Sequence, residues 1–330
     1  MTDQKENGQI MPARRFDVTT LGEMLLRLSV PSGKRLEQAA QLDVYPAGAE
    51  ANVVTLLARL ERQTCWAGAL PDNPLGRLAV DALRVAGVDT TNLLWKKSGR
   101  MGTYYVEFGE PPRGIQVTYD RAHSCTTQLQ VHEIDWDSLL DTRLLHLTGI
   151  TPALSSSCME IIAEAIRVAK ERHVPVSFDI NYRQKLWSTT EAEQTLLPLI
   201  QGVELLFCSQ ADATRVFHCT GSMHEIAQGM LERSKASHVI VTFAEQGALL
   251  WDGNKWLHEP ARPTAIVDRL GAGDALAAGV IHGWLDGNLS AGLRYGVTLA
   301  ALALGQYGDM LVTNQDELGQ LSKGDSSLAR

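Results

Sequence analysis

Short apolar runs alternate along this chain with longer segments of helical periodicity. Residues 16–22, 143–149, 174–180, 203–209 and 238–244 have the pattern of buried strands. Residues 156–173 have the helical pattern, with Ile162, Ala165, Ile166 and Ala169 on one apolar stripe. This alternation predicts an α/β fold, in which a mainly parallel sheet is covered by helices on both faces.

A second group of strand-like segments breaks the alternation. These segments lie near residues 24–30, 37–46, 102–109 and 114–121, and the last two are separated only by a turn containing Pro111, Pro112 and Gly114. Because no helix separates those two, the group predicts a small separate sheet. We expect this sheet to cover an active site, to supply a dimer interface, or to do both.

The length of 330 residues suits one large α/β domain, alone or with a small appendage. We expect a single domain over residues 16–320, a polar, disordered leader over residues 1–15 and a tail over residues 321–330. The sequence contains no internal repeat, no apolar signal-peptide core and no apolar run of bilayer-spanning length.

Charge and cysteine usage narrow the partners and the compartment. The net charge is −8 and no Lys/Arg-rich run occurs, so nucleic-acid and membrane partners are disfavoured, and an anionic ligand needs local arginines. The five cysteines form an odd set without a C-x-x-C pair. That set indicates free thiols in a reducing cytoplasm and gives no zinc site.

The stretch VDRLGAGDALAAG, residues 267–279, places three small residues, Gly271, Ala272 and Gly273, directly before Asp274 and an alanine-rich helix. Amides at such a helix start bind anions, and glycines let a phosphate approach them closely. A carboxylate beside a phosphate makes sense if Asp274 takes a proton from a hydroxyl that attacks the phosphorus. A tight turn in which Asp274 only complements the helix dipole is the alternative, and the motif alone leaves both open.

Competing motifs are missing around this loop. Leu276 stands at the last position of G-x-G-x-x-G, which counts against a dinucleotide-dependent dehydrogenase, and no Walker-type loop occurs. Two segments instead resemble signatures of the ribokinase-like (PfkB) carbohydrate kinases. DRLGAGD, residues 268–274, resembles D-T-x-G-A-G-D, and AGAEANVVTLLARL, residues 47–60, resembles G-G-x-x-x-N-x-A-x-x-L-A-x-L.

The resemblance extends from Phe16 to about Leu318. GEMLLRLSVP, VTYDRAHS, LTGITPAL, DINYRQKLW and GQYGDMLVT are most similar to segments of 2-keto-3-deoxygluconate kinases. The resemblance implies a ribokinase-like three-layer α/β/α fold with a small β-sheet lid.

The resemblance also implies roles for individual residues. Asp274 matches the catalytic base, and Gly271, Ala272 and Gly273 match an anion hole for the transferring phosphoryl group. Sugar-binding positions by resemblance are Gly48, Asn52, Tyr104, Tyr119, Arg121, Ile150, Arg183 and Asp309. Nucleotide-binding positions are Asn181, Arg183, Ser209, Thr242, Ala244, Gly247, Gly271 and Gly273. Ordinary packing stays open for Tyr104, Tyr119 and Ile150, whereas Arg121 or Arg183 can pair with a sugar-acid carboxylate in two-pronged geometry.

The sequence departs from the family pattern at several positions. Ala47 replaces one glycine of the first signature, Arg269 replaces the threonine of the second, and Ala244 replaces the middle glycine of the nucleotide loop. The family's N-x-x-E motif, tied to Mg²⁺, reads Ser209-Gln210-Ala211-Asp212. We therefore expect Mg²⁺ to be held by ATP phosphates and water without a direct protein ligand, and a monovalent cation stays open.

The implied reaction is transfer of the ATP γ-phosphoryl group to a primary hydroxyl, O6 of 2-keto-3-deoxygluconate, giving 2-keto-3-deoxy-6-phosphogluconate. A kinase for fructose, ribose or a deoxy-keto sugar of inositol breakdown is the alternative enzyme. A non-catalytic sugar-binding regulator on the same scaffold is a further alternative, which the intact Asp274 disfavours. Exposed lid edges predict a homo-oligomer that pairs through the lid sheet.

Overall fold

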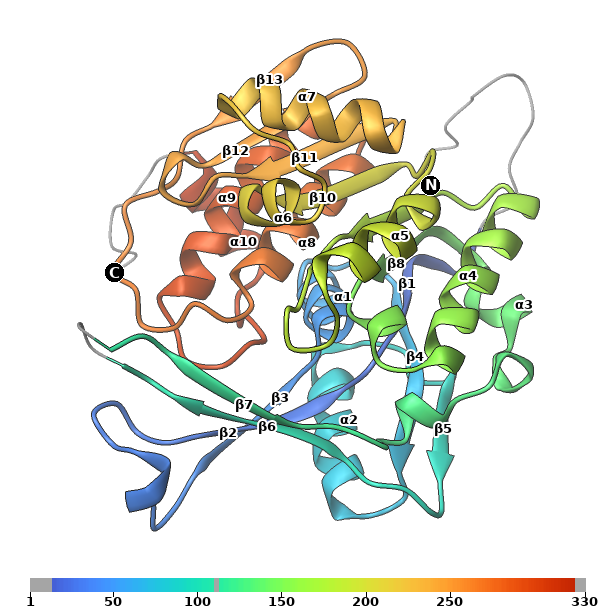
Figure 1. Ribbon diagram of the computed structural model, residues 1–330, viewed down its shortest axis with the longest axis vertical. Helices are drawn as coiled ribbons and strands as arrows, with labels where there is room; N and C mark the ends of the chain where they lie inside the picture. The colour runs from blue at the N-terminus through green and yellow to red at the C-terminus, as the bar shows by residue number, and fades with distance from the viewer. Residues whose placement is uncertain (1–13, 110–112, 324–330) are drawn as a thin grey trace.

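The computed structural model describes residues 14–109 and 113–323. Nine of the described strands form the large sheet, in the order β13-β12-β11-β10-β9-β8-β1-β4-β5 (Figure 1). They are β1 (Phe16–Leu21), β4 (Thr64–Pro71), β5 (Leu93–Lys96), β8 (Thr142–Thr148), β9 (Val176–Asp179), β10 (Leu205–Ser209), β11 (His238–Thr242), β12 (Ala248–Trp251) and β13 (Trp256–Glu259). Only the β11–β12 and β12–β13 pairings are antiparallel among them, so the mainly parallel sheet predicted from the alternation is confirmed.

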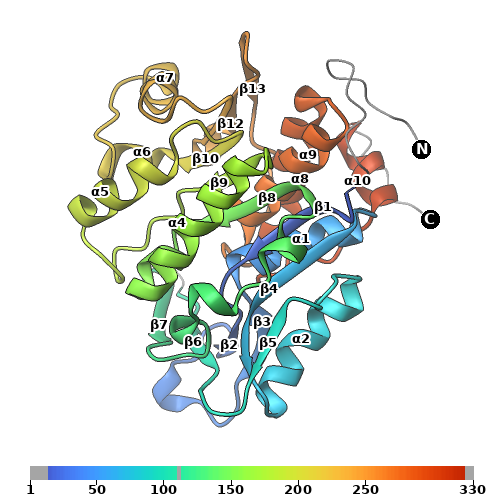
Figure 2. The ribbon, with the colours of Figure 1, turned by 90° about the vertical axis from the view of Figure 1, so that its right-hand side faces the viewer.

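Helices cover both faces of this sheet, as Figure 2 shows. One face carries α3 (Trp136–Leu139), α4 (Ser156–Glu171), α5 (Thr189–Leu199), α6 (Gln210–Arg215) and α7 (Met223–Ser234). The other carries α1 (Ala49–Arg59), α2 (Pro74–Ala86), α8 (Ala272–Leu285), α9 (Leu289–Leu304) and α10 (Gln315–Ser322). Each face has its own hydrophobic core, which gives the three layers.

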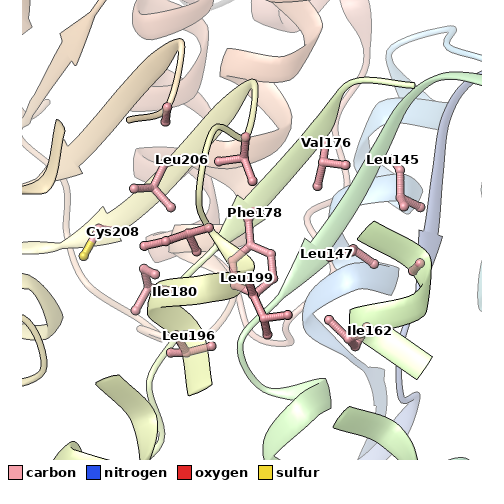
Figure 3. Close-up of a cluster of buried hydrophobic side chains, with 14 of the residues drawn as sticks. Leu145, Leu147, Ile162, Val176, Phe178, Ile180, Leu196, Leu199, Leu206 and Cys208 are labelled. Atoms are coloured by element: carbon pink, nitrogen blue, oxygen red, sulfur yellow. The ribbon is translucent and has the colours of Figure 1, made fainter. Parts of the chain in front are cut away.

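Alternation along the central strands supplies both cores. In β10, Leu206 and Cys208 point into the core under α4 and α5, which Figure 3 shows, while Leu205 and Phe207 belong to the opposite core. Successive side chains of a strand point to opposite faces, so a strand that is buried on both sides is apolar at most positions. This is why these strands read as continuous apolar runs in the sequence.

A four-stranded sheet, called the lid sheet here, is set apart from the large sheet (Figure 1). Its order is β3 (Asp43–Ala47), β2 (Leu25–Ser29), β6 (Gly102–Glu107) and β7 (Gln116–Asp120). All four predicted segments contribute a strand. Within segment 37–46 the strand begins only at Asp43, because Asp43 pairs with Ser29 at the end of β2, and a short 3₁₀ helix occupies residues 36–38.

The chain ends are described only in part. Of the expected leader, Arg14 and Arg15 lie within the described residues, and Arg15 pairs with Asp89 at 2.9 Å. The rest of the leader, Pro111, Pro112 and residues 324–330 of the expected tail lie outside them. Among the helices in the described ranges, none has the length and apolar character needed to cross a membrane.

Candidate active site

The residues predicted to bind ligands follow several parallel strands at one edge of the large sheet. Ile150 follows β8, Asn181 and Arg183 follow β9, Ser209 ends β10, and Thr242 ends β11. From β1 the chain adds β4 and β5 on one side and then returns to add β8, β9 and β10 on the other, so the strand order reverses beside β1. Ligands bind outside the carboxyl ends of strands at such a switch point.

The loop before α8 forms an open helix start at this edge. Gly271 caps α8 with φ of 83°, and a Cβ there would lie 2.2 Å from the carbonyl oxygen of Asp309, so only glycine fits. Gly273 is exposed, with nothing within 4 Å of the place where a Cβ would stand. This open space would let an anion approach the first amides of α8, and the anion hole stays a prediction.

Asp274 lies in the first turn of α8 and is held by Asn52 from α1. The Asn52 side-chain amide donates to Asp274 Oδ2 at 2.6 Å, while Asn52 Oδ1 is buried without a partner among the described residues. Burial raises the pKa of Asp274 well above its ordinary value, against the opposing effects of the Asn52 hydrogen bond and the Arg183 charge. The two signature motifs thus meet side chain to side chain.

Gly48, at the start of α1, lets the backbone of α1 approach the segment that follows the carboxyl end of β1. A Cβ on Gly48 would stand 2.4 Å from the carbonyl oxygen of Glu23. Any other residue here would push α1, and Asn52 with it, away from the site. Ala47, which replaces a family glycine, is buried in the lid core with Leu25, Tyr104 and Val106.

Tyr104 and Asp309 are brought together across the lid. The Tyr104 hydroxyl donates to Asp309 Oδ2 at 2.5 Å, and Arg27 of β2 binds Asp309 Oδ1 at 2.8 Å. Arg27 also pairs with Asp268 at 2.6 Å, and both of these side chains are fully buried. Tyr119 stacks at a tilt beside Tyr104, with ring centroids 5.6 Å apart.

Arg121 is already paired inside the protein. Its Nε donates to Glu23 Oε2 at 2.8 Å, its Nη2 binds the same oxygen, and Ser124 donates to Glu23 Oε1. Glu23 therefore occupies the Nε–Nη2 edge of the Arg121 guanidinium, so the two-pronged pairing with a substrate carboxylate that we expect of Arg121 or Arg183 is left to the Nη1–Nη2 edge of Arg121. Arg121 is 8% exposed and presents only its remaining edge to a ligand.

Arg183 is half-buried and directs Nη1 at the carbonyl oxygens of Asn181 and Tyr182, at 3.4 and 3.2 Å. Two carboxylates lie near it. Burial and the charge of Asp212 raise the pKa of Asp179 to about 7, and Arg183 opposes that rise. Burial also raises the pKa of Asp212, whose carboxylate accepts from the Tyr182 amide at 3.4 Å.

A cavity of about 250 Å³ opens between the lid sheet and this edge of the large sheet. Its walls are Tyr119 and Arg121 of the lid, residues 182–186, and Asp212 and Arg215 of α6. The cationic side chains in the wall are Arg121, Arg183, Lys185 and Arg215, against one acid, Asp212. Although the protein as a whole is acidic, this wall carries more positive than negative side chains, which suits an anion.

The predicted nucleotide loop, residues 242–247, keeps a glycine-like backbone although Ala244 replaces a glycine of the family pattern. Ala244 has φ of 49°, in the left-handed region that favours glycine, and Gly247 has φ of 89°. Asn181, which tolerates this region, has φ of 43°. Ser209 caps α6, because its hydroxyl accepts from the Asp212 amide at 3.0 Å. Among the described residues, Thr242, Ala244 and Gly247 form no hydrogen bond with Asp274, whose side chain is bound by Asn52.

Several residues of the site carried no predicted role. They are Glu23, Arg27, Glu50, Asp179 and Asp268. All five stand inside the segments whose resemblance was noted, such as GEMLLRLSVP and DINYRQKLW. A charged residue in an otherwise apolar strand, as Arg27 is, was the available signal, because a buried charge needs a partner.

Comparison with protein families and known proteins agrees with this geometry. Residues 15–316 match the model of the pfkB family carbohydrate kinases. The chain is 35% identical over 309 residues to a 2-dehydro-3-deoxygalactonokinase of Haloferax volcanii, covering 93% of this chain and 97% of the relative. It is 28% identical over 302 residues to a 2-dehydro-3-deoxygluconokinase of Bacillus subtilis, covering 90% and 92%.

A crystal structure of a 2-dehydro-3-deoxygluconokinase from Thermotoga maritima superposes with a TM-score of 0.88 at 32% identity, over 94% of this chain and 99% of that chain. The ribokinase-like fold that the resemblance implied is thereby confirmed. With a family model that spans nearly the whole described chain, and with relatives similar over their full lengths, this chain belongs to the pfkB family of carbohydrate kinases.

Proposed function

We propose that this protein uses ATP to phosphorylate the primary hydroxyl of a 2-keto-3-deoxy sugar acid, and that its main substrate is 2-keto-3-deoxygluconate. The observation that carries the proposal is the position of Arg183. It lines the cationic cavity and its charge also favours the ionised form of Asp274. A substrate with a carboxylate at one end and a hydroxyl at the other suits an arginine-lined cavity beside a carboxylate base.

The nucleotide and its metal fit the residues at the sheet edge. The family resemblance implies ATP and Mg²⁺, and a solved structure of similar fold, a putative Ribokinase II from E. coli, is a complex with both. The open α8 start with Gly271 and Gly273 suits a phosphoryl group, and Asn181 with Thr242, Ala244 and Gly247 lies on the nucleotide side by resemblance. Mg²⁺ keeps several waters and takes few carboxylates, so Asp179 and Asp212 suit it through water. Bound there, it would neutralise charge on the phosphates.

The proposed chemical step uses residues of this chain as follows. Asp274 takes the proton of the sugar O6 hydroxyl while the bond from O6 to the γ-phosphorus forms and the bond from that phosphorus to the bridging oxygen of ADP breaks. The amides of residues 271–273 stabilise the charge that develops on the γ-phosphoryl oxygens. Asn52 keeps the Asp274 carboxylate oriented, and its buried Oδ1 accepts a hydrogen bond from a sugar hydroxyl.

The relatives are named for both the glucono and the galactono epimers, which differ in the orientation of one hydroxyl. We propose that both are accepted, with 2-keto-3-deoxygluconate preferred. The site of transfer is tested with a 6-deoxy analogue of each acid. The analogues should compete with the parent acids without consuming ATP, and the product from the parent acids should carry phosphate at C6. Phosphorylation of a 6-deoxy analogue would refute transfer to O6.

We also propose a cytoplasmic location for the protein. Its five cysteines are all buried and free, as reducing conditions allow. Alkylation of the native protein should leave these thiols unmodified, and denaturation should expose all of them. An inter-cysteine bond in protein isolated from cells would contradict this location.

A further inference from the structure

We infer that Arg27 is a positioning residue. It holds Asp309 and residues 268–273, called the anion-hole loop here, in place against the lid sheet, and in this way sets the turnover of the kinase. The inference rests on the proposed function and deepens it. It concerns a residue that does not itself contact either substrate, because its side chain has no exposed surface.

The two terminal nitrogens of the Arg27 guanidinium face carboxylates from outside the lid sheet. Its Nη1 pairs with Asp309 Oδ1 at 2.8 Å, and its Nη2 lies 2.6 Å from Asp268 Oδ2. Its Nε donates to Ser29 Oγ at 2.8 Å, on the same lid strand. The forked guanidinium therefore joins β2 to two carboxylates, those of Asp268 and Asp309, which lie 41 residues apart in the sequence.

The two carboxylates in turn hold the anion-hole loop. Asp268 accepts from the Leu270 amide at 3.1 Å and from the Gly308 amide at 3.3 Å, which ties the start of the loop to the turn before Asp309. The Asp309 carbonyl occupies the place of a Cβ on Gly271, so this turn is the surface against which the anion hole is built. The Asp309 side chain also accepts from Tyr104 of the lid.

The lid contributes the surroundings of the guanidinium as well. Its Cζ lies 5.4 Å from the ring centroid of Tyr45 and 5.3 Å from that of Phe108, both lid residues. Gly308 lies close to the Tyr45 ring. A Cβ on Gly308 would stand 3.0 Å from a ring carbon. Arg27 thus lies where the lid meets Asp268 and the turn at residues 308–309.

A buried charge network of this kind does not serve stability efficiently, because desolvation offsets much of the attraction. Its geometric advantage is that a planar fork fixes two carboxylates at once, which a lysine ammonium cannot do. A small displacement of the groups that position reactants can lower turnover about 100-fold. We therefore expect the arginine fork, beyond its positive charge, to be required.

The test compares Arg27→Lys and the double variant Arg27→Met/Asp268→Asn with wild type. Removing Asp268's charge together with Arg27's avoids leaving both carboxylates unpaired, so the double variant keeps the test available if Arg27→Met alone does not fold. Arg100→Met is the matched control, because Arg100 pairs with Asp120 at 2.6 Å on the exposed lid surface. The readouts are kcat and KM for the best sugar, the Kd for ADP, and amide hydrogen exchange over residues 268–274.

We expect folded Arg27 variants whose kcat falls about 100-fold while the ADP Kd changes less than about 2-fold. Their 268–274 amides should exchange faster than those of wild type and of Arg100→Met. Variants that fold and keep both kcat and exchange rates at the level of Arg100→Met would overturn the inference. If wild type used only a neutral sugar, the proposed function would fail, and the same comparison with that sugar would still decide the role of Arg27. The exchange rates decide it without any substrate.

Discussion

The side-chain amide of Asn52 donates to Asp274 Oδ2 at 2.6 Å, across 222 residues of sequence. This bond joins the two signature segments, since Asn52 lies on α1 and Asp274 on α8. It also opposes the effect of burial on Asp274, because a hydrogen bond to the carboxylate favours its charged form. The bond therefore both orients the base and lowers its pKa.

Removal of this hydrogen bond should move the acid limb of the pH profile. Asp274 acts as a base only when ionised, and its raised pKa places that limb above the ordinary aspartate value of about 3.9. In Asn52→Ala the carboxylate loses a stabilising donor, so its pKa rises further and activity is lost at a higher pH. The profile of kcat/KM against pH measures this shift, with Asn254→Ala, in an exposed turn, as control. An acid limb that stays in place or moves to lower pH would exclude this role for Asn52.

Asp179 should make the ligand-free protein less stable as pH rises. Its pKa of about 7 in the folded state exceeds the unfolded value of about 3.9, so the folded state binds the proton more tightly. The stabilising contribution is complete below the unfolded pKa and is lost as pH rises through about 7. Asp179→Asn removes this dependence and should raise Tm by about 3 °C at pH 8. Thermal melts at pH 5 and pH 8 measure it, with Asp137→Asn as a surface control. An equal change in Tm at both pH values would contradict the assignment.

Truncation of Arg121 should lower the stability of the fold, whereas truncation of Arg183 should weaken binding of the sugar acid. Arg121→Ala strands the buried Glu23 carboxylate, which should cost about 3–5 kcal/mol of unfolding free energy. Arg183→Ala leaves no ion pair broken within the described residues and should mainly raise KM for the sugar acid, by about 10-fold or more. Urea unfolding and steady-state kinetics separate the two, with Arg172→Ala as a surface control. An unchanged KM in Arg183→Ala would remove Arg183 from substrate binding.

The lid sheet should pair with a second copy of the chain. Its edge strands are β3 and β7, and Asp43 and Val44 of β3 are exposed. The unpaired backbone N–H and C=O groups of an edge strand can pair with a strand of another chain, and most soluble oligomers are symmetric homo-oligomers. Light scattering at micromolar concentration should give at least the mass of a dimer, and Val44→Pro should reduce it. A monomer under these conditions would refute pairing through the lid.

Much of the fold followed from the sequence because its causes are local. The apolar strands 174–180 and 203–209 and the stripe of Ile162 and Ala165 arise from burial on repeating positions, which a single sequence displays. The lid segments were also recognisable, because several alternating strand-like segments near the N-terminal half break the βαβ order and two of them are separated only by a turn. Where a strand begins, as in segment 37–46, depends on pairing with β2, which is not a local property.

The site was less completely predictable. Asp274, Asn52 and Asp309 were identified through motifs, but their partners lie far away in the sequence. That Glu23 would occupy Arg121, and that Arg27 would bridge Asp268 and Asp309, depends on how the lid docks. A sequence shows which residues carry charge, whereas the pairing of buried charges is set by tertiary contacts.

The most direct test of the account is ADP release with Mg-ATP against a panel of acceptors: 2-keto-3-deoxygluconate, its galacto epimer, 2-ketogluconate, fructose, ribose and adenosine. Asp274→Asn serves as the blank, and its turnover should be at least about 100-fold lower because the general base is lost. We predict selective turnover of the ketodeoxy acids by wild type and retained sugar binding in Asp274→Asn. Turnover confined to a neutral sugar, or an Asp274→Asn variant as active as wild type, would contradict the account.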